Sequence, residues 1–314
     1  MLQQTKFTEI KKQPVDFKDG LFFIKHMQVP FQLIINMAIT ASSYALITLG
    51  FNLIYRNTKF FNMSHGIAMV GGYVVFFATS VLGWNIFLSI FSGIFASGII
   101  GYWAYVLVFL PLRKRKASSM TMMIASIGVL SIVQSIVAFL FTNKFQTMPN
   151  DLLIGKTHIA GGIITNTQIL IIFAPFIVLL GMTLLYKKTS FGKIAESIAD
   201  NENLAKIVGI NTDEFIGYIF FIGSAISGLS GISSGFSSGI EPGMGSGLFI
   251  KGIIASIIGG IGNIRGGIVG SFLLSFIENI VAWKISGEWK DIISFIMLIA
   301  VLILRPTGII NEKK

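Results

Sequence analysis

Nine long apolar runs, separated by short polar segments, constrain this chain more than any other feature of its sequence. They cover residues 31–55, 60–82, 84–110, 119–142, 165–186, 215–239, 247–262, 266–283 and 292–304. A helix needs about 20 apolar residues to cross a bilayer, and most of these runs approach that length. The later ones are short enough to be half-spans, re-entrant pieces or closely packed helices. The pattern predicts an all-α, polytopic transmembrane helical bundle with about eight or nine membrane segments.

The composition excludes an ordinary soluble domain. Hydrophobic residues make up 53% of the chain and charged residues 12%, whereas soluble domains carry about 25% charged residues. The net charge of +10 does not indicate nucleic-acid binding, because the basic residues gather in short loops between apolar runs. The chain has no cysteine, which excludes disulfides, thiolate metal sites and cysteine nucleophiles.

The positions of Lys and Arg predict an orientation. The basic run 113–116 and the loop 187–206 are expected in the cytoplasm, which places residues 143–164 outside. Nine full crossings would leave the five Lys before Pro30 outside, so either this tail tolerates that position or one run does not cross. The run 60–82, which His and Gly residues interrupt, is one candidate for a run that does not cross. We divide the chain into a tail at 1–30, part of which (16–27) could form an interfacial helix, a transmembrane domain at 31–310, and a tail at 311–314.

The most polar stretch between apolar runs is 190–210, which is predicted to form an amphipathic helix. It is too polar to enter a bilayer. Ile194, Ile198, Ala205 and Val208 fall on one helical face, with Asn201 as a gap. A connector between two spans needs only a few residues, so this helix is expected to dock against the membrane surface, its own protein or a partner.

Small residues recur at four-residue spacing in several runs. Helices associate in lipid through close backbone approach over small side chains, so these ridges predict packing seams within the bundle, with a subunit seam or a translocation path as alternatives. The ridges are Gly223, Ser227, Gly231, Gly235 and Gly239; Gly93, Ser97 and Gly101; and Gly252, Ser256 and Gly260.

Several motifs that would indicate enzymatic chemistry are incomplete. Gly155-Lys156-Thr157 lacks the first glycine of a phosphate-binding loop, because Asn150 stands there. The run 259–270 misses a dinucleotide fingerprint, because Arg265 takes the place of its third glycine. The three histidines, His26, His65 and His158, have no partner at metal-ligand spacing, so no metal site is expected. Transport or passive binding is therefore favoured over catalysis.

Polar residues inside the apolar runs are candidates for a transport path. Glu278 is one, although its run is apolar enough to insert with one unpaired charge, so packing or an interfacial position is the alternative. Lys251 is expected to extend its amine from near the outer end of its run toward water. Asn62, Ser64, His65 and Gly66 interrupt one run together, where a hydrogen-bonded helix break and a substrate contact are equally good interpretations.

Five segments of the chain, in order, resemble a known family. Residues 61–66 (FNMSHG) are similar to INFAHG, with Met63 and Ser64 as departures. Residues 259–270 are similar to GGIGSIPGAxxGG, with Asn263 and Arg265 at the Ser and Pro positions, and 288–291 and 305–309 (RPTGI) match two further signatures. Residues 190–210 resemble the family's cytoplasmic segment, with Lys193 in place of an Arg, Glu196 where a basic residue is usual, and matches at Ser190, Gly192, Ala199, Asp200, Ala205, Gly209 and Ile210.

On these motifs the chain, from about Ile34 to Ile310, resembles permease subunits of prokaryotic ABC importers, the branched-chain amino acid family of the LivH type. The resemblance implies a multi-pass protein of the plasma membrane that is not itself an enzyme. It implies a second permease subunit, similar or identical, an extracytoplasmic substrate-binding protein, and separate ATPase subunits that use ATP and Mg, with no cofactor on this chain. The segment 190–210 would be the ATPase-coupling helix of an alternating-access importer for branched-chain amino acids.

Three alternatives remain at this stage. The same family fold also serves urea or short amides. An ion-coupled secondary transporter would not need the helix at 190–210, and would show more acidic residues near mid-membrane than Glu278 alone. A structural membrane scaffold would explain the small-residue ridges but not the order of the motifs.

Overall fold

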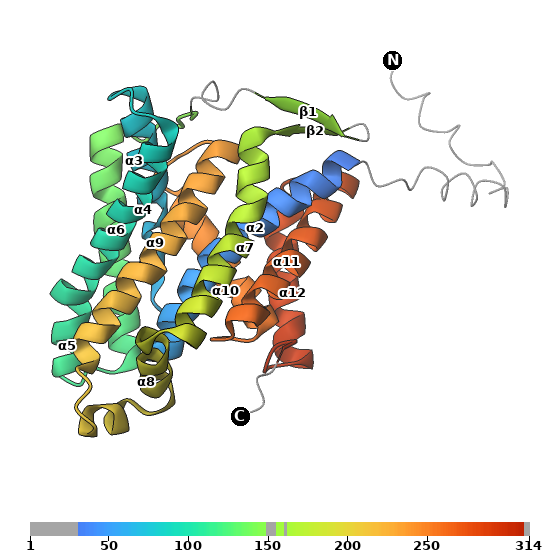
Figure 1. Ribbon diagram of the computed structural model, residues 1–314. Coiled ribbons are helices and arrows are strands. Elements are labelled where there is room, and N and C mark those ends of the chain that lie inside the picture. Colours follow the sequence, from blue (N-terminus) through green and yellow to red (C-terminus); the bar gives the residue numbers. More distant parts are fainter. Residues whose placement is uncertain (1–30, 149–154, 160–161, 311–314) are drawn as a thin grey trace, which may run out of the picture.

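The computed structural model describes residues 31–148, 155–159 and 162–310, and the statements below refer to these residues. The expected interfacial helix at 16–27, His26 and the tail 311–314 lie outside them. The chain forms one bundle of tilted helices with a small hairpin across one end (Figure 1). In chain order the elements are α2 (Phe31–Thr58), η1 (Met63–Ala68), α3 (Met69–Ser80), α4 (Ile86–Ala104), η2 (Tyr105–Phe109), α5 (Leu110–Lys114), α6 (Ser119–Phe141), β1 (Lys156–Ile159), β2 (Gly162–Thr165), α7 (Asn166–Lys188), α8 (Ser190–Ile207), α9 (Thr212–Ser238), α10 (Met244–Gly259), α11 (Ile264–Lys284) and α12 (Trp289–Leu304).

The expected all-α, polytopic membrane bundle is confirmed. Among the described residues, seven helices are long and apolar enough to cross a membrane, and α10 and α12, of 16 residues each, are shorter. Each of the nine apolar runs corresponds to one of these nine helical segments. The short antiparallel hairpin of β1 and β2 was not predicted.

The bundle has two ends, which we call the hairpin face and the α8 face after the elements that lie there (Figure 1). Helix α2 reaches both: the Ile163 amide donates to Gln32 Oε1 at 2.8 Å, and Arg56 lies 3.7 Å from Glu196 of α8. The chain therefore enters α2 from the end opposite α8. The segment Met63–Ser80 is one of the seven long apolar helices, and α3 ends at the hairpin face. The structure thus does not support the suspicion that the run 60–82 fails to cross.

The small-residue ridges pack against other helices of the same chain, as expected. A Cβ built on Gly231 of α9 would lie 1.9 Å from the Ala68 carbonyl oxygen, and one built on Gly71 would lie 2.5 Å from the Gly228 carbonyl oxygen. One turn earlier on α9, a Cβ on Gly101 of α4 would meet the Ser224 side chain. No larger side chain fits at these crossings, so the backbone of α9 touches those of η1 and α3 directly, and α4 packs against the small Ser224 side chain of α9.

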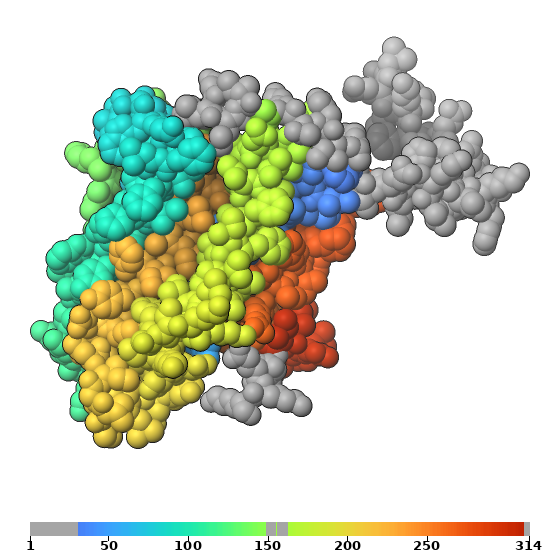
Figure 2. Space-filling view, viewed as in Figure 1, coloured from blue at the N-terminus to red at the C-terminus, as the bar shows by residue number. Residues whose placement is uncertain are grey.

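Burial differs sharply between helices. Nearly all of α2 beyond its first turns is buried, whereas only Ile171, Pro175 and Met182 are buried in α7. Figure 2 shows α7 lying across the outside of the bundle, between the α3 and α4 region on one side and α11 on the other. Helix α2 is thus a central element and α7 a peripheral one.

Candidate functional site

Helix α8 is two helical pieces joined at Asn201, whose φ and ψ of −155° and 100° are not helical. The Asn201 side chain caps the second piece by accepting a hydrogen bond from the Leu204 amide at 3.1 Å. The single helical face predicted for 190–210 is therefore wrong at its far end: Ile198 and Ala205 are buried, but Val208 is 74% exposed.

The inner side of α8 docks on its own protein. Ala195, Ile198, Ala199 and Ala205 are buried against the bundle. The rings of Phe191 and Phe215 lie 4.6 Å apart, which joins the start of α8 to the start of α9. The close approach to α7 requires a glycine at Gly192, because a Cβ there would lie 2.2 Å from the Tyr186 carbonyl oxygen.

Charged side chains fix α8 at two further points. Arg113, at the end of α5, lies 2.6 Å from Glu202 Oε1 and 3.6 Å from Asp213, and Lys206 lies 2.8 Å from the same Glu202 oxygen. Partial burial raises the pKa of Glu202, but the hydrogen bond from Lys206 and the charge of Arg113 outweigh it, and the pKa lies below its ordinary value. Glu196, which departs from the family pattern, faces Arg56 of α2 at 3.7 Å.

The outer side of α8 carries an exposed apolar patch. Leu204, Ile207 and Val208, at the end of α8, are 59%, 79% and 74% exposed. Of the predicted coupling residues, Gly192, Ala199 and Ala205 are buried, and the exposed ones are Ser190, Lys193, Glu196, Asp200 and Gly209. The sequence analysis missed this exposed patch because it placed Val208 on the docked face. The patch consists of apolar residues in the second piece of α8 that lie on a different helical face from the buried Ala205.

The motif at 61–66 forms a buried helix start. Asn62 caps η1 by accepting hydrogen bonds from the amide and the hydroxyl of Ser64, at 3.2 and 2.5 Å. The Met63 amide donates to Ser126 of α6 at 2.9 Å, and a Cβ on Gly66 would lie 3.1 Å from the carbonyl oxygen of Gly245. These contacts support the interpretation of a hydrogen-bonded helix break; a substrate contact in another conformation stays a prediction.

His65 is the polar residue of this motif without a hydrogen-bonding role. The ring is 1% exposed, lies edge-on to Phe51 and Phe249, and neither nitrogen has a hydrogen-bond partner. The backbone of Ile47 is nearby but not in hydrogen-bonding geometry. A buried polar group without a partner is costly, which marks His65 as the strongest of the predicted substrate-path residues. Within the described residues no group of three or more His, Asp or Glu side chains could hold a metal.

Glu278 belongs to a buried polar cluster that joins four helices. Lys251 Nζ of α10 lies 2.7 Å from Glu278 Oε1 of α11 and 2.8 Å from Asp291 of α12. The Tyr44 hydroxyl of α2 donates to Glu278 Oε2 at 2.8 Å, and Ser294 of α12 donates to Oε1. The Lys251 amine reaches the largely exposed Asp291, as its expected extension toward the surface requires, but the side chain is only 11% exposed and is also paired with the fully buried carboxylate of Glu278. The alternative for Glu278, packing within the bundle, agrees with these contacts.

A second polar cluster, at the α8 face, brings two family signatures together. Asn52 of α2 accepts from Ser256 at 2.5 Å and donates to the Asn263 carbonyl at 3.0 Å. The segment 305–309 then docks on the end of α10, where the Ile309 amide donates to the Ile258 carbonyl at 2.9 Å. A Cβ on Gly308, whose φ is +81°, would lie 2.4 Å from Gly260. The motifs at 259–270 and 305–309 therefore form one interface.

Sequence reasoning missed the partnership of Lys251 with Glu278, and it missed Asn52. A usable signal was present for the first: one positive and one negative residue interrupt successive apolar runs, and helices joined by a short link are antiparallel neighbours. Asn52 carried no such signal, because a single amide in an apolar run has many candidate partners.

The fold and these sites define a multi-pass membrane protein with a helix docked at one end and no complete enzymatic motif among those tested. Its central domain matches a family model: residues 33–302 match the branched-chain amino acid transport system / permease component. The chain belongs to this family. Its expected membership and membrane location are thus confirmed.

Curated relatives cover most of the chain. It is 30% identical over 295 residues to the high-affinity branched-chain amino acid transport system permease protein BraD of Pseudomonas aeruginosa, covering 90% of this chain and 95% of that protein. It is 29% identical over 306 residues to the corresponding permease protein LivH of Escherichia coli K12, covering 93% and 96%. A probable LivH permease of the archaeon Methanocaldococcus jannaschii is 27% identical over 197 residues, covering 59% and 60%.

Proposed function

We propose that this chain is the membrane-spanning permease subunit of an ATP-driven importer and moves branched-chain amino acids across the plasma membrane of a prokaryote. The family assignment and the names of two relatives that align over at least 90% of the chain support the substrate class. The main interpretation of the sequence is favoured over a secondary transporter, since the family is one of transport-system permease components.

The exposed apolar patch of α8 is the observation that carries the coupling role. Three large apolar side chains, Leu204, Ile207 and Val208, extend from a helix that is already docked on its own bundle. Exposed charged residues, Asp200 and Lys206, lie close to them in the sequence, and polar residues of this kind are typical of the rim of a protein interface. The proposed occupant is an ATPase subunit, which uses ATP and Mg while this chain binds neither. A second permease subunit and an extracytoplasmic substrate-binding protein complete the importer.

In the proposed mechanism, ATP-driven closure of the ATPases moves α8, and α8 moves the bundle by alternating access. Three contacts can transmit the motion: the Gly192 approach to α7, the contact of the Phe191 and Phe215 rings with α9, and the Arg56–Glu196 pair with α2. Because α9 packs closely on η1, α3 and α4 over glycine and serine residues, these elements move with it as one body. Asn62, Ser64, His65, Gly66 and Glu278 remain predictions for the substrate path.

Site-directed crosslinking tests the coupling role, and the chain has no cysteine to remove. Asn203→Cys and Ile207→Cys place thiols on the exposed side of α8 in membranes that contain the importer's ATPase subunit. We expect crosslinks to the ATPase whose yield changes when ATP is added. Ala199 is 9% exposed and faces the bundle, so Ala199→Cys is expected to give little product.

Ser238→Cys, exposed at the hairpin end of α9, is the matched control and should give no ATPase crosslink. If Asn203→Cys and Ile207→Cys react freely with soluble reagents yet capture no ATPase, the coupling proposal is overturned.

Uptake of labelled leucine by the reconstituted importer tests the substrate class, with isoleucine, valine, urea and acetamide as competitors. Competition by urea but not by isoleucine or valine would contradict it.

A further inference from the structure

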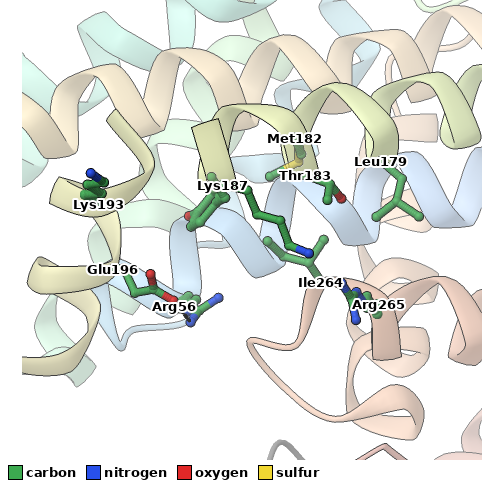
Figure 3. Close-up of a pocket in the computed structure, with 10 residues that line it drawn as sticks. Arg56, Leu179, Met182, Thr183, Lys187, Lys193, Glu196, Ile264 and Arg265 are labelled. Carbon is green, nitrogen blue, oxygen red and sulfur yellow. Dashed lines mark ion pairs between the residues drawn. The ribbon is translucent and has the colours of Figure 1, made fainter. Parts of the chain in front are cut away.

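A cavity of about 520 Å³ opens at the α8 face between α2, α7, α8 and α11 (Figure 3). Four of its lining residues are basic, namely Arg56, Lys187, Lys193 and Arg265, and one, Glu196, is acidic. In the view of Figure 3, Arg56 and Glu196 lie on one side and Arg265 on the other, and the amine of Lys187 extends between them. The cavity therefore carries an excess of positive charge.

Most of this positive charge has no counter-charge in the part of the chain that the structure describes. Arg56 has two partners, Glu196 at 3.7 Å and the ring of Tyr186 at 5.8 Å. Lys187, Lys193 and Arg265 form no ion pair with any acidic side chain of the described residues. Cations held around one cavity repel each other, and an anion in the cavity relieves this repulsion.

The cations lie where a membrane meets water. Arg56 is in the last turn of α2, Lys187 is in the last turn of α7, and Arg265 is in the first turn of α11. All three helices are long and apolar enough to cross a membrane. These terminal turns are therefore at the depth of lipid phosphates, and, in the proposed orientation, at the cytoplasmic leaflet, whose anionic lipids attract basic residues.

The inner wall of the cavity is apolar. Leu179, Met182 and Ile264 line it beside the basic residues. On the same part of α7, Leu180 and Leu184 are 61% and 44% exposed, so the surface next to the cavity is suited to hydrocarbon. A basic rim with an apolar wall, continuous with a lipid-facing helix, fits a molecule that has a phosphate at one end and acyl chains at the other.

From these observations we infer that this cavity binds the phosphate of an anionic phospholipid, with Lys187 and Arg265 as its principal ligands. The lipid links the ends of α2, α7 and α11 next to α8. Three of the departures from the family motifs line this cavity: Arg265 stands where the related motif has Pro, Lys193 replaces an Arg, and Glu196 stands where a basic residue is usual. The inference does not depend on the transported substrate or on ATPase coupling.

Native mass spectrometry of the full chain, purified in mild detergent, tests the site. The probes are phosphatidylglycerol and phosphatidylcholine with identical acyl chains. We expect phosphatidylglycerol to bind more tightly, and Lys187→Gln with Arg265→Gln to weaken it by about 25-fold, at about fivefold for each cation removed. The exchange variant Lys187→Arg with Arg265→Lys should keep most of the affinity, which separates loss of charge from misfolding.

The control variant, Arg115→Gln with Lys116→Gln, removes two exposed cations that follow α5. It should leave the preference for phosphatidylglycerol unchanged. An equal loss in both double variants would show general surface attraction and overturn the proposal. No preference for phosphatidylglycerol in the unaltered chain would also overturn it.

The source of the phosphate is tested separately with inorganic phosphate alone. Binding of inorganic phosphate that displaces phosphatidylglycerol and is lost in Lys187→Gln with Arg265→Gln would support a phosphate site and overturn its assignment to lipid. If that variant keeps its lipid affinity but loses a co-purifying ATPase that the control retains, the cations serve a protein partner and the proposal fails. The lipid experiment needs no transport assay, so its failure is distinct from failure of the importer proposal.

Discussion

Lys251 and Glu278 are opposite charges inside the part of the bundle that crosses the membrane. Taking each charge from water costs several kcal/mol, and their close contact compensates only when hydrogen bonds satisfy the remaining polar atoms. Tyr44 and Ser294 supply those hydrogen bonds to the carboxylate, and Asp291, which is largely exposed, faces the amine from its other side. Each charge is therefore tolerated only because the other is present.

Removing one partner should be far more costly than removing both. Lys251→Met leaves a buried carboxylate unpaired, and we expect the free energy of unfolding to fall by about 3–5 kcal/mol. Lys251→Met with Glu278→Gln should recover most of that loss, because Gln keeps the hydrogen-bonding shape without the charge. Denaturant unfolding of the purified chain in detergent measures both. A double variant no more stable than Lys251→Met would contradict the pairing.

At the scale of elements, α9 can pack this closely on η1 only because Gly231 has no side chain. The Ala68 carbonyl occupies the space where a Cβ on Gly231 would be, at 1.9 Å. This atom belongs to the backbone and cannot rotate away, so a larger residue must separate the two elements. A similar backbone contact recurs along α9 at Gly223, whose carbonyl oxygen would lie 2.4 Å from a Cβ built on Gly50 of α2.

Gly231→Ala is expected to destabilise the bundle by about 1–3 kcal/mol through overpacking. Gly128→Ala is the matched control, since Gly128 of α6 is also helical and has no atom within 4 Å of a built Cβ. It should be neutral or stabilising, because Ala favours helix over Gly by up to about 1 kcal/mol. Thermal unfolding of both variants in the same detergent compares them. Equal stability of the two would show that α9 can move away from η1 without cost.

The helices themselves could be predicted from sequence because apolar length and small-residue spacing are local properties. The run at 31–55 falls within α2 and the run at 215–239 ends one residue beyond α9, and the break at Asn62 follows from polar residues in an apolar run. The kink in α8 could not be predicted, because Asn201 is compatible with both a polar helix surface and a cap. The packing of helices that are distant in the sequence decides which charge pairs with Lys251 and which side of α8 stays exposed. No local sequence pattern indicates this packing.

At the scale of the whole molecule, the described helices alternate between the two faces, so that α2 starts and α12 ends on opposite sides (Figure 1). This alternation predicts which introduced thiols share a compartment. Ser80→Cys and Ser238→Cys should react with an impermeant maleimide from the side of the hairpin. Asn203→Cys and Lys114→Cys should react only from the side of α8. Labelling of Ser80→Cys from the same side as Asn203→Cys would show that the run 60–82 does not cross.

The Lys251–Glu278 pair also bears on how the chain enters the membrane during its synthesis. Helix α10 inserted alone would carry an ammonium into hydrocarbon, and α11 alone would carry a carboxylate, each at a cost of about 2.5–3.5 kcal/mol. Only residues 260–263 separate the two helices, and their charges meet at 2.7 Å. If the two helices leave the translocon together as a helical hairpin, the Lys251 ammonium and the Glu278 carboxylate compensate each other, and neither charge enters lipid unpaired.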